Sequence, residues 1–143
     1  MERRELLAGL ATISALSAAP SLYAQAAHQH SSEAGKHAGV IKTASECVTT
    51  GEVCVSHCID LLSQGDKALG LCAQRSSELV AICQALASIA AQDAPSLTTL
   101  ASLAEDVCKR CEAECRKFKQ HPQCIACADA CLSCATECKK LHG

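Results

Sequence analysis

Aromatic residues and methionine are scarce in this chain of 143 residues. It has no Trp, its only Tyr and Phe are Tyr23 and Phe118, and its single Met is the first residue. A core made from this composition must be filled by Leu, Ile, Val, Ala and Cys. Cysteine is the exception to the scarcity, with thirteen residues. That share, about a tenth of the chain, is typical of a disulfide scaffold or a metal site.

Strong charge and long apolar runs are missing too. The formal net charge is −2, which is too close to zero for a protein that binds nucleic acid or a membrane surface by electrostatics. The N-terminal apolar run is too short to cross a bilayer, and no other segment is long enough. We therefore expect no nucleic-acid partner and no membrane insertion of the mature chain.

The N-terminus has the pattern of an export signal. Arg3 and Arg4 precede the apolar stretch LLAGLATISALSAA, and Ala24–Ala26 (AQA) form a cleavage site of small residues. The paired arginines resemble a twin-arginine leader, although Glu2 and Leu6 stand where Ser and Phe are usual. The alternative is that they are ordinary basic residues of a general secretory signal.

These features divide the chain into three parts. We expect residues 1–26 to be the export signal, residues 27–36 to be a flexible segment, and residues 37–143 to form one domain. The mature protein would then lie in the periplasm or another extracytoplasmic compartment. The twin-arginine route exports folded proteins, so thiols could fold and stay reduced in the cytosol before export.

Helix-favouring residues dominate the mature chain, and no strand-like alternation appears. The first helix is expected over residues 37–63, with Gly65 just past its end. Asp66 caps a second helix that reaches about residue 92. A third follows the break at 93–96 and ends near Lys119, and Pro122 opens a fourth that reaches about residue 141. Four helices with short connections predict an all-α, antiparallel up-down-up-down four-helix bundle.

The cysteines lie on a single face of every expected helix when they are placed at about 100° per residue. The same faces carry Leu79, Leu86, Ala101 and Ala104, so the cysteine faces point into the bundle. The candidate metal ligands are Cys47, Cys54, Cys58, Cys72, Cys83, Cys108, Cys111, Cys115, Cys124, Cys127, Cys131, Cys134 and Cys138.

Packing, disulfides, zinc and an iron–sulfur cluster are four explanations for so many cysteines. Pure packing suits one or two buried cysteines better than thirteen. A full disulfide scaffold is disfavoured because the count is odd and cysteines seven residues apart on one helix are beyond bridging reach. A closed zinc site needs only four cysteines. The run CIACADAC resembles a bacterial ferredoxin motif only loosely, and it lacks the Gly and Pro of ferredoxin loops.

Cu(I) suits the pattern better, because it is soft and prefers thiolate ligands. A buried neutral thiol that exchanges its proton for a monovalent cation leaves the net charge of the core unchanged. The core could then take up about one Cu(I) per cysteine without the cost of burying unpaired charge. A thiol-rich iron–sulfur or redox electron-transfer protein remains the alternative function.

The cysteine motifs CVTTGEVCVSHC, CKRCEAEC and CIACADACLSCATEC resemble those of the bacterial four-helix-bundle copper storage proteins. The resemblance covers the mature chain, and the leader is similar to that of the exported branch. It implies a homotetramer of bundles that holds many Cu(I) ions on all thirteen cysteines, limits copper toxicity and supplies copper enzymes or chaperones. It implies no catalysis. Some exported relatives add Met at the mouth of the bundle, and the mature chain has none.

Histidines are candidates for assisting copper uptake. In an antiparallel bundle, His57 and His121 would lie at one end, close to Cys58 and Cys124. His37 would lie at the opposite end. The alternative for each is an ordinary solvated histidine on the surface.

The helical wheel also predicts the position of two groups outside the cysteine faces. The charged residues of the last two helices, including Glu114, are expected mainly on outward faces. Leu71, Ile82 and Ile89 form a second apolar stripe, which either widens the core or joins one bundle to another.

Overall fold

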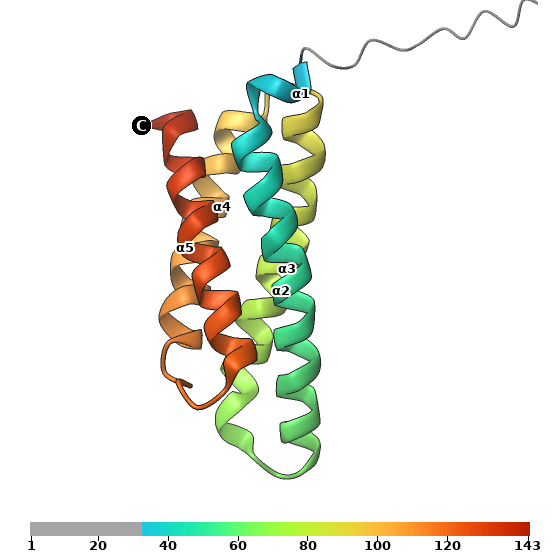
Figure 1. Cartoon of the computed structure of the whole chain (residues 1–143), viewed down its shortest axis with the longest axis vertical. Coiled ribbons are helices and arrows are strands. Elements are labelled where there is room, and N and C mark those ends of the chain that lie inside the picture. The colour runs from blue at the N-terminus through green and yellow to red at the C-terminus, as the bar shows by residue number, and fades with distance from the viewer. Residues whose placement is uncertain (1–32) are drawn as a thin grey trace, which may run out of the picture.

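The computed structural model describes residues 33–143, so the expected export signal lies outside the described residues. Within that range the chain is helical and has no strand. Four long helices form the molecule (Figure 1), and two short ones precede α2 and α3. Their bounds are α1 Glu33–Lys36, α2 Ala38–Ser63, η1 Lys67–Leu69, α3 Gly70–Ala91, α4 Leu97–Cys115 and α5 Pro122–His142.

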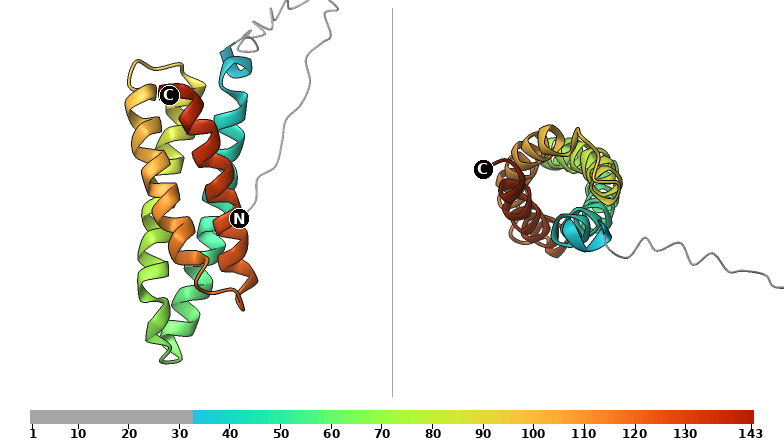
Figure 2. Two further views of the ribbon diagram at one scale, coloured as in Figure 1. Left: turned by 90° about the vertical axis from the view of Figure 1, so that its left-hand side faces the viewer. Right: turned by 90° about the horizontal axis from the view of Figure 1, so that it is seen from above.

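The long helices form a closed ring. Helix α2 packs against α3 and α5, and α4 packs against the same two helices. Viewed along the bundle axis in Figure 2, the four helices surround one common centre. Successive helices run in opposite directions, which confirms the predicted antiparallel up-down-up-down bundle.

The two ends of the bundle carry different connections (Figure 1). The α2–α3 and α4–α5 connections lie at one end, which we call the His57 end. Helix α1, the α3–α4 turn and the C-terminus lie at the other, which we call the His37 end. At the His57 end the α2–α3 hairpin reaches farther along the axis than the α4–α5 connection.

The α2–α3 connection follows the predicted turn signals. Gly65 has a φ of +96°, a conformation that glycine adopts without the steric cost of a Cβ. Its N–H donates to the carbonyl of Leu62, and the N–H of Asp66 donates to that of Leu61. The Asp66 side chain accepts a hydrogen bond from the N–H of Ala68 at 3.1 Å. The predicted stop at Gly65 is confirmed. Asp66 is a helix cap as predicted, but it caps the short helix η1, and α3 itself begins only at Gly70.

The end of α4 differs from the prediction. The helix was expected to reach Lys119, but it ends at Cys115, and the following residues form turns closed by bonds such as Phe118 N–H to Cys115 C=O at 3.0 Å. The start of α5 was predicted correctly, with Pro122 in its first turn. His121 is extended (φ −108°, ψ 104°), because a residue before proline is pushed out of the helical region. The chain must therefore leave α4 early enough to make this turn.

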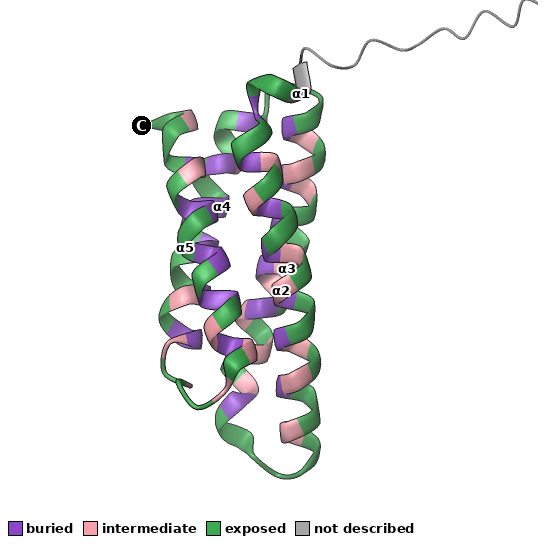
Figure 3. Cartoon of the chain, in the orientation of Figure 1, coloured by how far each residue is buried: buried purple, intermediate pink, exposed green. Residues whose placement is uncertain are grey.

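The core is a column of small side chains. All thirteen cysteines are fully buried, and no Phe, Tyr or Trp is among the buried residues of the described chain. Figure 3 shows the buried positions on the inward faces of the helices. Toward the His37 end the column holds Cys134 and Cys138 together with aliphatic side chains. The aliphatic residues are Val40, Ala44, Leu86, Ala90, Leu97 and Ala101. None of the described helices is both long and apolar enough to cross a membrane.

Two expectations about the outer faces need correction. Glu114 was expected on an outward face but is only 7% exposed, and Lys117 covers it through an ion pair of 2.6 Å. The stripe on α3 is divided, because Ile82 and Ile89 pack against the core while Leu71 remains 44% exposed. Position on the helical wheel alone does not reveal such cover by long neighbouring side chains.

Candidate metal centre

Every cysteine of the chain lies within the described residues, and all thirteen are free and buried. The closest reported pair of sulfurs, in Cys72 and Cys115, is 3.5 Å apart, whereas a disulfide bond measures about 2.05 Å. The thiols therefore meet without forming bridges in the described residues. Such a concentration of free sulfur in a dry core is suited to soft metal ions.

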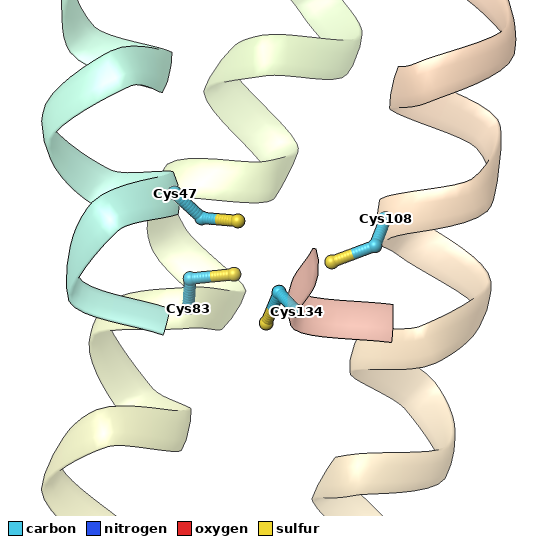
Figure 4. A group of neighbouring side chains, drawn as sticks. All are labelled: Cys47, Cys83, Cys108 and Cys134. Atoms are coloured by element: carbon cyan, nitrogen blue, oxygen red, sulfur yellow. The ribbon is translucent and has the colours of Figure 1, made fainter. Parts of the chain in front are cut away.

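One group of thiols takes a ligand from each long helix. Cys47 of α2, Cys83 of α3, Cys108 of α4 and Cys134 of α5 have their sulfurs within 4.8 Å of one another. Figure 4 shows the four side chains pointing toward a common centre. The sulfur of Cys138 lies a further step along α5, 3.9 Å from that of Cys134. This group occupies the His37 half of the thiol column.

A second group of four lies near the His57 end. Cys54 and Cys58 of α2, Cys72 of α3 and Cys124 of α5 also have their sulfurs within 4.8 Å of one another. Cys54 is 3.9 Å from Cys72 and 3.8 Å from Cys124. Cys115, the last residue of α4, lies at the same end, with its sulfur 3.5 Å from that of Cys72.

Two groups of three extend from this second group toward the middle of the bundle. One joins Cys54 to Cys115 and Cys127, and the other joins Cys127 to Cys111 and Cys131. Because Cys54 and Cys127 each belong to two groups, the groups share ligands and form a ladder. An ion held by one group would have thiols of the next within reach.

Ser76 is a functional position that the sequence analysis missed. It is fully buried, and its hydroxyl donates to the sulfur of Cys54 at 3.4 Å. The same hydroxyl is 3.8–3.9 Å from the sulfurs of Cys111, Cys115 and Cys127. The available signal was its position, because Ser76 lies one turn after Cys72 on the inward face of α3. The sequence analysis considered only cysteines and histidines as candidate ligands, so it did not single out Ser76.

Burial sets the protonation of the thiols at the His57 end. It raises the pKa of Cys58 from the ordinary 9.0 to about 11, and that of Cys124 to about 12. Both thiols are therefore neutral near pH 7. A metal ion that binds them must displace their protons.

Deeper in the ladder the thiols interact with one another. Hydrogen bonds from Cys115, Cys127 and Cys72 lower the pKa of Cys54, whereas hydrogen bonds to Cys115 and Cys54 raise that of Cys72. One thiolate is thus stabilised by neighbouring S–H donors, and it opposes a second negative charge beside it. Further thiolates in this space require positive ions between them.

His57 and His121 meet at the His57 end, as predicted. His57 Nε2 is 3.0 Å from His121 Nδ1, and both side chains are half-buried. His57 directly precedes Cys58, and His121 lies three residues before Cys124. The histidine pair therefore lies at the same end of the bundle as Cys58 and Cys124, with its two facing nitrogens hydrogen-bonded to each other.

His37 lies at the opposite end, also as predicted, but its partner is a carboxylate. Its Nε2 is 2.7 Å from Asp93 in the α3–α4 turn, and Lys36 pairs with the other oxygen of Asp93 at 2.8 Å. His37 is only 8% exposed. It fastens the start of α2 to the α3–α4 turn.

A four-helix bundle with a core of free thiols defines a class of helical proteins built to hold soft metal ions. The copper storage protein family matches residues 24–143, and the chain belongs to that family. Its fold is similar to a solved structure described as the Cu(I)-bound copper storage protein BsCsp3. The TM-score is 0.67 at 28% identity, over 73% of this chain and 95% of the other. A comparison with curated protein sequences found no match.

Proposed function

We propose that the protein stores Cu(I), with the thiolates of all thirteen core cysteines as ligands. The observation that carries this function is the ladder itself. Thirteen free buried thiols gather in groups whose sulfurs lie within 4.8 Å. The membership of the family and the likeness to a structure described as Cu(I)-bound support the same metal.

Charge balance explains why the ion is monovalent. Each Cu(I) that replaces a thiol proton leaves the core as neutral as before. A divalent ion would leave an excess of positive charge at the same one-to-one ratio, and buried charge without a partner is costly. A store with about one ion per thiol is therefore open to Cu(I) and closed to zinc at full loading.

Copper enters and leaves at the His57 end in this proposal. There the thiols of Cys58 and Cys124 stand close to the connections, and His57 and His121 meet at the same end. The histidine pair acts as the first acceptor and passes the ion to the thiols. At the His37 end, by contrast, His37 and His142 are paired with the carboxylates of Asp93 and Glu105.

The remaining parts of the proposal rest on the sequence and the resemblance. Residues 1–26 act as a twin-arginine export signal, residues 27–36 link it to the bundle, and the mature protein works outside the cytoplasm. It assembles as a homotetramer, supplies copper-requiring enzymes or chaperones, and catalyses no reaction.

The decisive experiment is an anaerobic titration of the reduced protein with Cu(I) against a chromophoric chelator. We expect about ten or more ions per chain, because every thiol is a soft ligand within reach of another. Helical circular dichroism should be the same before and after loading. A matched titration with Zn²⁺ should stop at a few ions per chain.

Two results would contradict storage. Saturation with Cu(I) at about one to four ions would indicate a discrete metal site, since a closed site needs only four cysteines. A brown protein with a redox-active chromophore, isolated from cells grown with iron, would favour the iron–sulfur alternative. Cu(I) on thiolates is d¹⁰ and nearly colourless.

A further inference from the structure

Thiols are unevenly spaced on the four helices. On α4 and α5, successive cysteines are three or four residues apart, which is about 4.5–6 Å along the axis. On α2 the step from Cys47 to Cys54 is about 10.5 Å, and on α3 the step from Cys72 to Cys83 is about 16.5 Å. Helices α2 and α3, which form half of the bundle wall, therefore carry no cysteine near the middle of the bundle.

Gly51 of α2 and Leu79 of α3 occupy the inward positions in this stretch. Leu79 is fully buried on the inward face of α3, between Ser76 and Cys83. A Cβ placed on Gly51 would lie 3.6 Å from Leu79 Cδ2 and 2.8 Å from Val80 Cγ2. The absence of a side chain at Gly51 lets α3 approach α2 closely, with Leu79 packed against the bare backbone. At this level α2 and α3 offer no metal ligand.

The thiols consequently separate into two sets, which we name after the ends. The His37 compartment consists of Cys47, Cys83, Cys108, Cys134 and Cys138. The His57 compartment consists of Cys54, Cys58, Cys72, Cys111, Cys115, Cys124, Cys127 and Cys131. None of the groups with sulfurs within 4.8 Å of one another combines members of both sets.

Cys131 stands at the boundary. It forms a close group with Cys111 and Cys127 on the side of the His57 compartment. On α5 it also stands three residues before Cys134 of the His37 compartment, about 4.5 Å along the axis, and hydrogen bonds with Cys108 and Cys47 raise the pKa of its thiol. It therefore reaches both sets at the level where Leu79 closes the opposite wall.

We infer that the store has two compartments that fill in series, and that copper reaches the inner one across the Leu79 boundary by way of Cys131. This inference rests on the proposed storage function. Copper enters at the His57 end in that proposal, and Cys138, the thiol nearest the His37 end, is fully buried. Each transfer exchanges one Cu–S bond for another, the ion stays Cu(I), and the proton of the receiving thiol passes to the sulfur that is vacated.

The inference predicts two kinetic phases when a fully loaded protein is mixed with excess chelator. Ions of the His57 compartment leave first and those of the His37 compartment follow, with amplitudes of about eight to five at one ion per thiol. In the Cys131→Ala variant the slow phase should become slower by about tenfold or more, an increase of about 1.4 kcal/mol in the barrier. The fast phase should keep its rate. Cys127→Ala is the matched control, because it removes a thiol one turn away within the His57 compartment.

A second pair of variants tests the boundary by adding a ligand. Leu79→Met conserves volume and places a thioether, a soft copper ligand, at the closed level. We expect it to speed the slow phase severalfold. Leu79→Ile keeps the apolar wall without adding a ligand, and it should leave the slow phase unchanged. Helical circular dichroism of the apo and loaded forms verifies that all variants fold.

The outcomes separate this inference from the storage function. Uptake of about ten or more ions that all leave in one phase would overturn the compartments and retain the store. The same holds if Cys131→Ala and Cys127→Ala behave alike, or if Leu79→Ile speeds release as much as Leu79→Met. Saturation at a few ions would overturn the storage function and the compartments together.

Discussion

The two ends of the bundle differ in chemistry although the same four helices form both. At the His57 end the thiols continue up to Cys58 and Cys124, and the His57–His121 pair lies at the same end. At the His37 end the buried column holds aliphatic side chains such as Leu86 and Leu97 beside its thiols, and His37 pairs with Asp93. In our proposal the His57 end serves ligand exchange, and the other end contributes mainly to stability. Changes at the two ends should accordingly affect different properties.

The largest effect on stability is expected from Leu86→Ala, among the aliphatic side chains of the His37 end. Leu86 is fully buried, so its truncation should lower the free energy of unfolding of the apo protein by about 2–5 kcal/mol. Denaturation in urea measures the loss, and Leu103→Ala, at a 47% exposed leucine on α4, is the control with little change. The copper capacity of Leu86→Ala should equal that of the parent. A proportional loss of capacity would contradict this expectation.

Alkaline pH should act on the other end. The folded state raises the pKa of Cys58 to about 11 and of Cys124 to about 12, so their contribution to stability is complete below about pH 9 and is lost as the pH rises toward those values. At about pH 10 the apo protein should have lost on the order of 1 kcal/mol for each of the two thiols. The Cu(I)-loaded protein has no such protons to lose and should show no decline. Urea midpoints at several pH values measure this, and an equal decline in both forms would contradict it.

The two histidines provide a matched pair of substitutions. His57→Ala should slow the initial uptake of Cu(I) severalfold, because in our proposal His57 lies at the end where copper enters. It should leave stability nearly unchanged, because the residue is only half-buried. His37→Ala should leave uptake unchanged and cost about 0.5–1.5 kcal/mol of stability, the usual contribution of a hydrogen bond. Stopped-flow uptake and urea denaturation of both variants decide the matter. Identical uptake rates would remove the histidine pair from the path of copper.

The smallest effect is expected at the fastening of the His37 end. Hydrogen bonds from Lys36 and His37 lower the pKa of Asp93. A carboxyl group with a lowered pKa contributes stability above its ordinary pKa, and the contribution is lost as the pH falls through the folded value. Asp93→Asn tolerates the positive φ of 47° at this position and removes the charge. The variant should be slightly less stable than the parent at neutral pH, and the difference should vanish in acid.

Much of the molecule follows from short-range rules in the sequence. The 3.6-residue period of the cysteines predicts their inward face, and Gly65, Asp66 and Pro122 mark helix ends that the structure confirms. The same rules failed for the end of α4, where the demands of the turn before Pro122 outweigh the helix-favouring composition of residues 116–119. They also failed for Glu114, which Lys117 covers. The exposure of a side chain depends on such neighbours as well as on its angle around the helix.

The sequence by itself therefore determined the class of fold, the inward stripes of thiols and the preference for a soft monovalent ion, because each depends on helical periodicity and the chemistry of sulfur. Only the tertiary structure decided which thiols meet. It placed Ser76 among four sulfurs, brought His57 against His121, and set Leu79 on Gly51 across the middle of the ladder. These meetings depend on the axial register between helices, which side-chain volumes fix through packing. A periodicity within one helix carries no information about that register.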